Sequence, residues 1–263
     1  AMSFYGILSL APLLVLMVTA TGWLGESTQQ KVVQRVESIV GPQAGQTVVV
    51  EGGAGSGKTR LVREFVAQLS KRASPLLIAL RGDASRRSEP LGALSRATAE
   101  ALGLPAPSGG LDVLRTALQA TLAARLPASH TPRVAAFFGE LFGAPYPDDA
   151  HPLLAAARSE GARTGDQIAR AWMDWLDAET HSRPAIVLID DAPLVDQPSL
   201  DVIAGALAQV RRRRLLVITV ARSGSRDLLP EALVGPRTVV IPVDKLERAA
   251  CEAIIKEALG EKA

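Results

Sequence analysis

A glycine-rich segment contains the residues whose types and spacing point most directly to chemistry. It reads GGAGSGKT from Gly52 to Thr59 and matches the pattern G-x-x-x-x-G-K-[ST] at every fixed position. Glycines let the backbone curl so that consecutive N–H groups point at phosphate oxygens, and a following helix adds the positive end of its dipole. We expect Lys58 to reach the β- and γ-phosphates of a nucleotide and the Thr59 hydroxyl to ligate Mg²⁺. The residues expected to bind the nucleotide are Gly52, Gly53, Ala54, Gly55, Ser56, Gly57, Lys58, Thr59 and Arg60.

A pair of acids supplies the second half of this chemistry. A phosphate loop works with an acid on a neighbouring strand that holds Mg²⁺. Asp190 and Asp191 directly follow the apolar run IVLI at 186–189, which is the Walker B pattern. We expect Asp190 to bind the metal and Asp191 to polarise the attacking water, a role more often filled by glutamate. The alternative is that one of the two acids only caps a helix.

Three further features carry arginine or tryptophan side chains that could bind a ligand. Arg222 ends the strand-like run LLVITVAR, where its guanidinium could meet the γ-phosphate or, equally, form a surface salt bridge. The arginine run at 211–214 closes a helical pattern, and cations favour a helix C-terminus, so we interpret it as a solvated helix end. Trp172 and Trp175 lie on the apolar side of one helical pattern and are expected to be packing residues.

Apolar runs that alternate with helical patterns must position these residues. A strand over 47–51, a helix over 59–72 and a strand over 76–81 form a βαβ unit, which implies a parallel sheet. Continuously apolar strands indicate a sheet that is covered on both faces. The fold class is therefore α/β, a parallel sheet of about five strands with a helical insertion. Further strands are expected at 185–190, 215–221 and 238–243, helices at 111–126, 165–178, 200–210 and 244–260, and the insertion over 83–180.

Composition limits the classes of function. The chain has 263 residues, 48% of them hydrophobic and 21% charged, so it can bury a substantial core. Its formal net charge of +2 leaves no overall electrostatic footprint for nucleic acid, and an aromatic content of 4% argues against a base-stacking surface. The single cysteine, Cys251, excludes an internal disulfide and fits a reducing compartment.

The first residues form an uncharged apolar segment. Residues 4–24 are apolar or small, and as a helix they would span roughly 30 Å, the thickness of a bilayer core. Lys31 and Arg35 follow this segment and no cation precedes it, so the positive-inside rule places the bulk of the chain in the cytoplasm. The expected location is the inner (cytoplasmic) membrane with the remaining domain in the cytoplasm. The alternative is a buried or signal-like helix, which would make the protein cytoplasmic.

Residues from about 47 to 260 resemble the predicted-ATPase module of STAND/AAA-type signalling NTPases. The resemblance rests on EGGAGSGKTRLVREF, IVLIDDAPLVDQPSLD and LLVITVAR. The blocks PRVAAFFGELFGAPYPDDAHPLLAAAR and GDQIARAWMDWLDAE are similar to the version in bacterial regulators that join a Ser/Thr kinase, this ATPase and tandem repeats. The resemblance implies a sheet of the ASCE type with strand order 5-1-4-3-2. It also implies slow ATP hydrolysis and a nucleotide-dependent switch.

Residues from about 3 to 46 are similar to a membrane segment of the YihY/BrkB family. The simplest interpretation of the whole chain is a fusion of a membrane segment with a truncated ATPase module. We expect a transmembrane segment at 1–25, a helical linker at 26–46, an ATPase domain at 47–243 and the start of a lid at 244–263.

The sequence therefore predicts a membrane-tethered P-loop NTPase that binds Mg·ATP and acts as a regulatory switch. Asp191, Lys58 and Arg222 are the expected catalytic residues, and Thr59 and Asp190 the expected metal ligands. The expected partners are ATP, the membrane, and a second copy or another protein; none of the patterns indicates nucleic acid. Two alternatives remain open, a non-catalytic nucleotide-binding or interaction module and a membrane-protein fragment fused to a truncated ATPase.

Overall fold

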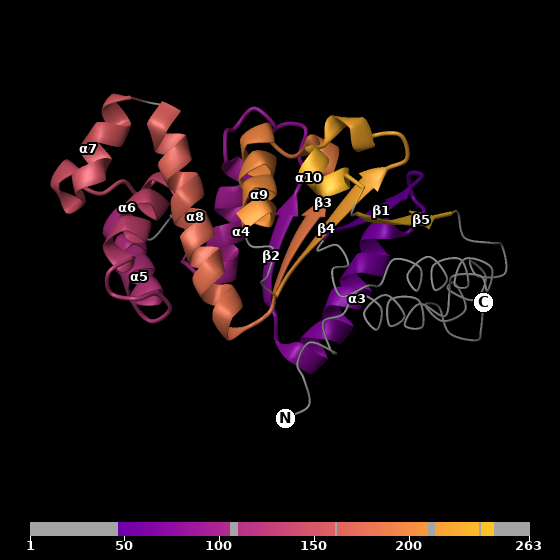
Figure 1. The fold of residues 1–263 in the computed structure, drawn as a ribbon, viewed down its shortest axis with the longest axis horizontal. Coiled ribbons are helices and arrows are strands. Elements are labelled where there is room, and N and C mark those ends of the chain that lie inside the picture. Colours follow the sequence, from indigo (N-terminus) through magenta and orange to yellow (C-terminus); the bar gives the residue numbers. More distant parts are fainter. Residues whose placement is uncertain (1–46, 106–109, 161, 210–213, 237, 245–263) are drawn as a thin grey trace.

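The computed structural model describes residues 47–105, 110–160, 162–209, 214–236 and 238–244 (Figure 1). The expected transmembrane segment, the helical linker and the helix expected after residue 244 lie outside these residues. Of the helices within the described ranges, none is both long enough and apolar enough to cross a membrane.

A five-stranded parallel sheet forms the centre of the molecule. The strand order is β2-β3-β4-β1-β5, which confirms the expected order 5-1-4-3-2 as seen from the opposite edge. The strands in the middle of the sheet are buried almost throughout, as continuously apolar sequences require. Their bounds are β1 Thr47–Gly52, β2 Leu76–Arg81, β3 Ala185–Asp190, β4 Leu215–Arg222 and β5 Val239–Val243.

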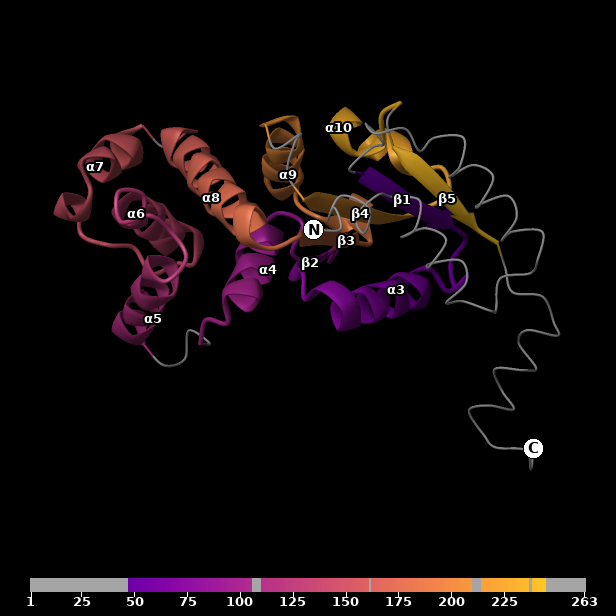
Figure 2. The ribbon, with the colours of Figure 1, turned by 60° about the horizontal axis from the view of Figure 1, so that its bottom comes forward.

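Helices cover the two faces of the sheet in a way that the strand order dictates. The connection from β1 to β2 runs in one direction across the sheet, and the later connections run back in the other direction. Because βαβ connections are right-handed, these crossovers place their helices on opposite faces. Helix α3 (Lys58–Ala73) accordingly lies on one face, and α9 (Gln197–Gln209) and α10 (Glu231–Val234) lie on the other (Figure 2). The side of α3 that packs on the sheet consists of Leu61, Val62, Phe65, Val66 and Leu69.

The insertion between β2 and β3 is helical, as expected. In both views α5, α6 and α7 form a group beyond α8, on the side of the sheet that ends in β2 (Figures 1 and 2). The helix expected over 111–126 ends earlier, at Ala123, because Pro127 disfavours the helical conformation just before it. The helices are α4 Gly92–Leu102, α5 Leu111–Ala123, α6 Thr131–Leu141, α7 Pro152–Ser159 and α8 Ala162–Ser182.

Two tryptophans form the core of this insertion. Trp172 and Trp175 of α8 are both fully buried, so they are packing residues, as expected. The ring of Trp175 meets Phe138 edge-on at 5.9 Å, and the indole N–H of Trp172 donates to the hydroxyl of Thr98 on α4 at 3.0 Å. Helix α8 thereby contacts both α6 and α4. The arginines at 211–213 lie outside the described residues.

Candidate nucleotide-binding site

The glycine-rich segment forms an open loop between β1 and α3. Gly55 and Gly57 have positive φ angles of 74° and 90°, which residues with a Cβ rarely adopt. A Cβ added at Gly53, Gly55 or Gly57 would meet nothing within 4 Å, so open space lies beside the loop at these positions. This arrangement leaves room for a bound anion at the backbone of the loop.

The first glycine of the loop is packed rather than open. A Cβ at Gly52 would lie 2.2 Å from the carbonyl oxygen of Val243 and 2.8 Å from the hydroxyl of Ser56. Ser56 is 3% exposed, and its hydroxyl has no hydrogen-bond partner among the residues that the structure describes. Gly52 thus lets the loop leave the sheet directly beside the end of β5.

Lys58 bends back over the loop. Its Nζ donates hydrogen bonds to the carbonyl oxygens of Gly52 at 3.0 Å and Gly53 at 2.6 Å. These bonds hold the ammonium group at the mouth of the loop, where the side chain is only half-buried. A phosphate bound there would compete with the two carbonyls for the same cation.

The two sequence motifs meet at Thr59 and Asp190. The Thr59 hydroxyl donates to Oδ1 of Asp190 at 3.0 Å, and Asp190 is 8% exposed. Mg²⁺ is a hard cation that prefers oxygen ligands and is commonly held by one or two carboxylates together with substrate phosphates. The hydroxyl and the carboxylate fit such an ion, and the loop beside them fits the phosphates.

Asp191 has an unusual backbone conformation. Its φ and ψ angles are 49° and 46°, in the left-handed region, and its N–H donates to Oδ1 of Asp190 at 3.1 Å. It precedes the short 3₁₀ helix η4 (Ala192–Leu194) but makes no side-chain capping bond to it. The alternative interpretation of Asp191 as a capping acid therefore has no support in this geometry.

Arg222 lies beside the loop, whereas the Arg60 side chain makes no hydrogen bond or ion pair with the described residues of the site. Arg222 ends β4 directly opposite Gly52 in the β1–β4 register, and its side chain is exposed. Within the described part of the chain no carboxylate pairs with its guanidinium, so the alternative of a surface salt bridge is not realised there. Arg60 is exposed on α3, and no described contact joins it to the loop.

Sequence reasoning missed a second buried acid close to this site. Asp196 is 2% exposed, and Ser199 is fully buried beside it. The spacing D-x-x-S just before a helix is a typical N-cap pattern, and this signal could have marked both residues. Nothing in that spacing indicates their contacts with α4, which is about a hundred residues earlier in the chain.

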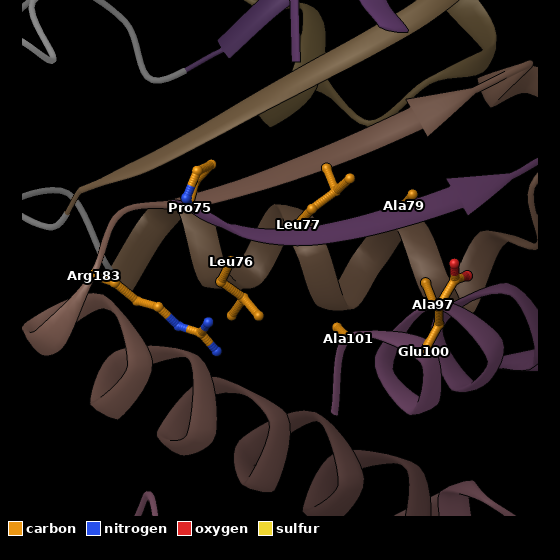
Figure 3. Close-up of a pocket in the computed structure, with 8 residues that line it drawn as sticks. All are labelled: Pro75, Leu76, Leu77, Ala79, Ala97, Glu100, Ala101 and Arg183. Carbon is orange, nitrogen blue, oxygen red and sulfur yellow. The ribbon is translucent and has the colours of Figure 1, made fainter. Parts of the chain in front are cut away.

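A groove elsewhere in the molecule does not belong to this site. It has a volume of about 310 Å³ and lies along the first half of the edge strand β2, whereas the phosphate loop follows the carboxyl end of β1. Figure 3 shows Leu77 and Ala79 on one side of the strand and Leu76 on the other, toward Arg183. The groove is lined by Pro75, Leu76, Leu77, Ala79, Ala97, Glu100, Ala101 and Arg183.

A parallel sheet in this strand order, with a phosphate loop after β1 and an acid at the end of β3, is the architecture of the P-loop NTPase fold. The sequence profile of the AAA ATPase domain matches residues 25–218, well over half of the chain. The chain belongs to the AAA ATPase domain family. No curated protein matches the sequence. The match begins at residue 25, so it includes part of the chain ahead of β1.

Proposed function

We propose that this protein binds Mg·ATP and acts as a regulatory switch that hydrolyses ATP slowly. The observation that carries the proposal is the hydrogen bond between Thr59 and Asp190, which brings the phosphate-loop motif and the acid motif to one point. Membership of the AAA family supports nucleotide binding. The regulatory role rests on the resemblance to STAND-type modules.

Each site residue has a separate part in this proposal. Lys58 moves from its two carbonyl partners to the β- and γ-phosphates, and Thr59 and Asp190 hold the magnesium ion. Magnesium, when bound, neutralises charge on the phosphates. Asp191 accepts a proton from the attacking water, and Arg222 stabilises charge on the γ-phosphate.

Hydrolysis is tested by a substitution that removes the base but leaves the phosphate contacts. Asp191→Asn should keep ATP affinity within about threefold and lower turnover by about a hundredfold, the usual size of a general-base contribution. Its control is Asp201→Asn, an exposed acid on α9 whose side chain accepts from Gln197. Turnover that is equal in the parent and in Asp191→Asn would exclude Asp191 as the base, and no turnover in the parent would leave a nucleotide-binding module.

The membrane tether is a separate part of the proposal and rests on the apolar residues 4–24 alone. It places the protein at the cytoplasmic membrane with the ATPase domain in the cytoplasm. Fractionation of cells that express the full chain should recover it with membranes after a high-salt wash. Recovery in the soluble fraction would remove the tether and leave the nucleotide site unaffected.

A further inference from the structure

A buried carboxylate connects the end of β3 to the start of α4. Oδ1 of Asp196 accepts hydrogen bonds from the N–H groups of Leu91 at 2.8 Å and Ser199 at 2.9 Å. Oδ2 accepts from the N–H of Ala93 at 3.0 Å and from the Ser199 hydroxyl at 2.8 Å. A charged acid is costly to bury unless its oxygens are satisfied, and here four donors surround it.

Ser199 extends this connection by one more hydrogen bond. Its hydroxyl, which donates to Asp196, also accepts from the N–H of Leu94 at 3.0 Å. The first N–H groups of a helix have no partner within the helix, and those of α4 find theirs on the segment after β3. Leu91, which precedes α4, has a φ of 59°, a conformation that a residue with a branched side chain rarely adopts without outside support. We call Asp196, Ser199 and the N–H groups of Leu91, Ala93 and Leu94 the Asp196 clamp.

The segment that precedes the clamp is in direct contact with the nucleotide site. The N–H of Gly82, just after β2, donates to the carbonyl oxygen of Asp190 at 2.8 Å. A Cβ at Gly82 would lie 2.2 Å from the carbonyl oxygen of Asp191 and 2.8 Å from the Cβ of Leu194, so no space separates the two segments. A shift of the backbone at Asp191 must therefore move the chain after β2 as well.

Magnesium would act on the same atoms. Oδ1 of Asp190 accepts from both the Thr59 hydroxyl and the Asp191 N–H, so a metal ion at that carboxylate competes with both bonds. The backbone of Asp191 is in the left-handed region. Once its N–H is released, it can leave this region for a conformation that is more common in residues other than glycine.

We propose that Asp196 is a positioning residue that couples the nucleotide site to the start of α4, and through α4 to the helical insertion. The coupling rests on the proposed binding of Mg·ATP. Asp190 and Asp191 begin the segment that contains Asp196. Because the clamp fixes the N-terminus of α4 to this segment, it transmits a change at the two acids to α4. Helix α4 in turn contacts α8 through the bond between Thr98 and Trp172.

Hydrogen exchange of the full chain, with and without Mg²⁺ and a non-hydrolysable ATP analogue, tests this coupling. In the parent, nucleotide should change the exchange rate of amides in 82–94 by about tenfold, within the usual range of coupling between two sites. Asp196→Asn replaces one accepting oxygen by an amide that cannot accept. It should bind the analogue within about threefold of the parent and lose the response in 82–94.

Two further variants separate coupling from stability. Thr98→Val removes a buried hydrogen bond of α4 that lies outside the clamp, and its response in 82–94 should match that of the parent. Ser199→Ala removes one donor to Asp196 and the acceptor of the Leu94 N–H, and it replaces Asp196→Asn if that variant does not fold. It should weaken the response in 82–94 while leaving affinity for the analogue unchanged.

Each contrary result has its own meaning. A parent that does not bind the analogue overturns both the proposed function and the coupling. A parent that binds without any change in 82–94, or an Asp196→Asn variant that responds like the parent, overturns the coupling alone. Loss of the response in Thr98→Val would show that any weakening of α4 abolishes it, which also contradicts a specific role for Asp196.

Discussion

The hydroxyl of Thr59 donates to Oδ1 of Asp190 at 3.0 Å, although the two residues are 131 positions apart in the sequence. Thr59 is held by the first turn of α3 and Asp190 by the last position of β3. A helix that packs on the sheet and a strand within the sheet thus bring a hydroxyl and a carboxylate to the carboxyl end of the strands. Open α/β sheets bind their ligands at this end.

This pair predicts how ATP affinity depends on magnesium. Thr59→Ala removes the hydroxyl ligand, so ATP affinity in Mg²⁺ should fall about tenfold, which corresponds to about 1.4 kcal/mol. Thr59→Ser keeps the hydroxyl and should bind like the parent. Calorimetric titrations in Mg²⁺ and in EDTA measure both. If ATP affinity depends on magnesium equally in the parent and in Thr59→Ala, Thr59 is excluded as a magnesium ligand.

The packing of the first loop glycine predicts an effect on stability. Gly52→Ala places a Cβ 2.2 Å from the Val243 carbonyl oxygen and should lower the free energy of unfolding by about 2 kcal/mol. Gly53→Ala is the matched control, because a Cβ there meets nothing within 4 Å, and it should change stability by less than about 0.5 kcal/mol. Urea unfolding without nucleotide measures the two variants. Similar losses in both would contradict the close contact between Gly52 and β5.

The two core tryptophans should differ in what their indole N–H groups contribute. Trp172→Phe leaves the fully buried Thr98 hydroxyl without its donor, whereas the indole N–H of Trp175 has no partner among the described residues. Both substitutions lose buried ring area, so the hydrogen bond decides the difference. Trp172→Phe should be the more destabilising by about 1 kcal/mol in urea unfolding. The opposite order would mean that Trp175 has a partner of its own.

Stability should fall in mild acid because of His151. Burial and the nearby Arg133 hold the pKa of His151 below the ordinary histidine value of 6.5, and its Nδ1 accepts the N–H of Leu153 at the start of α7. Because the folded pKa is lowered, the unfolded chain takes up the proton first, and stability is lost as pH falls through about 6.5 toward the folded pKa.

His151→Asn tests this dependence on pH. Asparagine is a good N-cap residue and does not titrate in this range, so the variant should keep the cap and lose part of the acid sensitivity. The measurement is the urea midpoint at pH 7.5 and pH 5.5. If the midpoint of the variant falls as much as that of the parent between these two pH values, His151 is not the responsible group.

The strands and the phosphate loop could be predicted because their signals are local. Each strand is a continuous apolar run, and the glycine pattern directly follows one of these runs. The strand order came from the resemblance, since periodicity alone does not tell which strands are neighbours. Contacts between two segments that are distant in the sequence could not be predicted from local patterns. Asp196 shows this, because its spacing to Ser199 indicates a helix cap, while two of its donors belong to Leu91 and Ala93.

Unusual backbone conformations at single residues also could not be predicted from the sequence. Asp191 and Leu91 both have positive φ angles, although neither is the glycine that such a position favours. The bond from its N–H to the Asp190 carboxylate and the close packing of Gly82 hold Asp191, and the Asp196 clamp holds Leu91. Local propensity would have placed Leu91 in the common right-handed or extended regions.

Calorimetric titration of the full chain with ATP in Mg²⁺, beside Lys58→Ala, tests whether the phosphate loop binds ATP. The exposed Arg63 on the next turn of α3 supplies the control, because Arg63→Ala also removes one cation but lies outside the loop. We expect the parent and Arg63→Ala to bind with similar micromolar affinity and Lys58→Ala to bind at least about tenfold more weakly. Equal binding by Lys58→Ala, or no binding by a folded parent, would contradict the claim that this loop holds the phosphates of ATP.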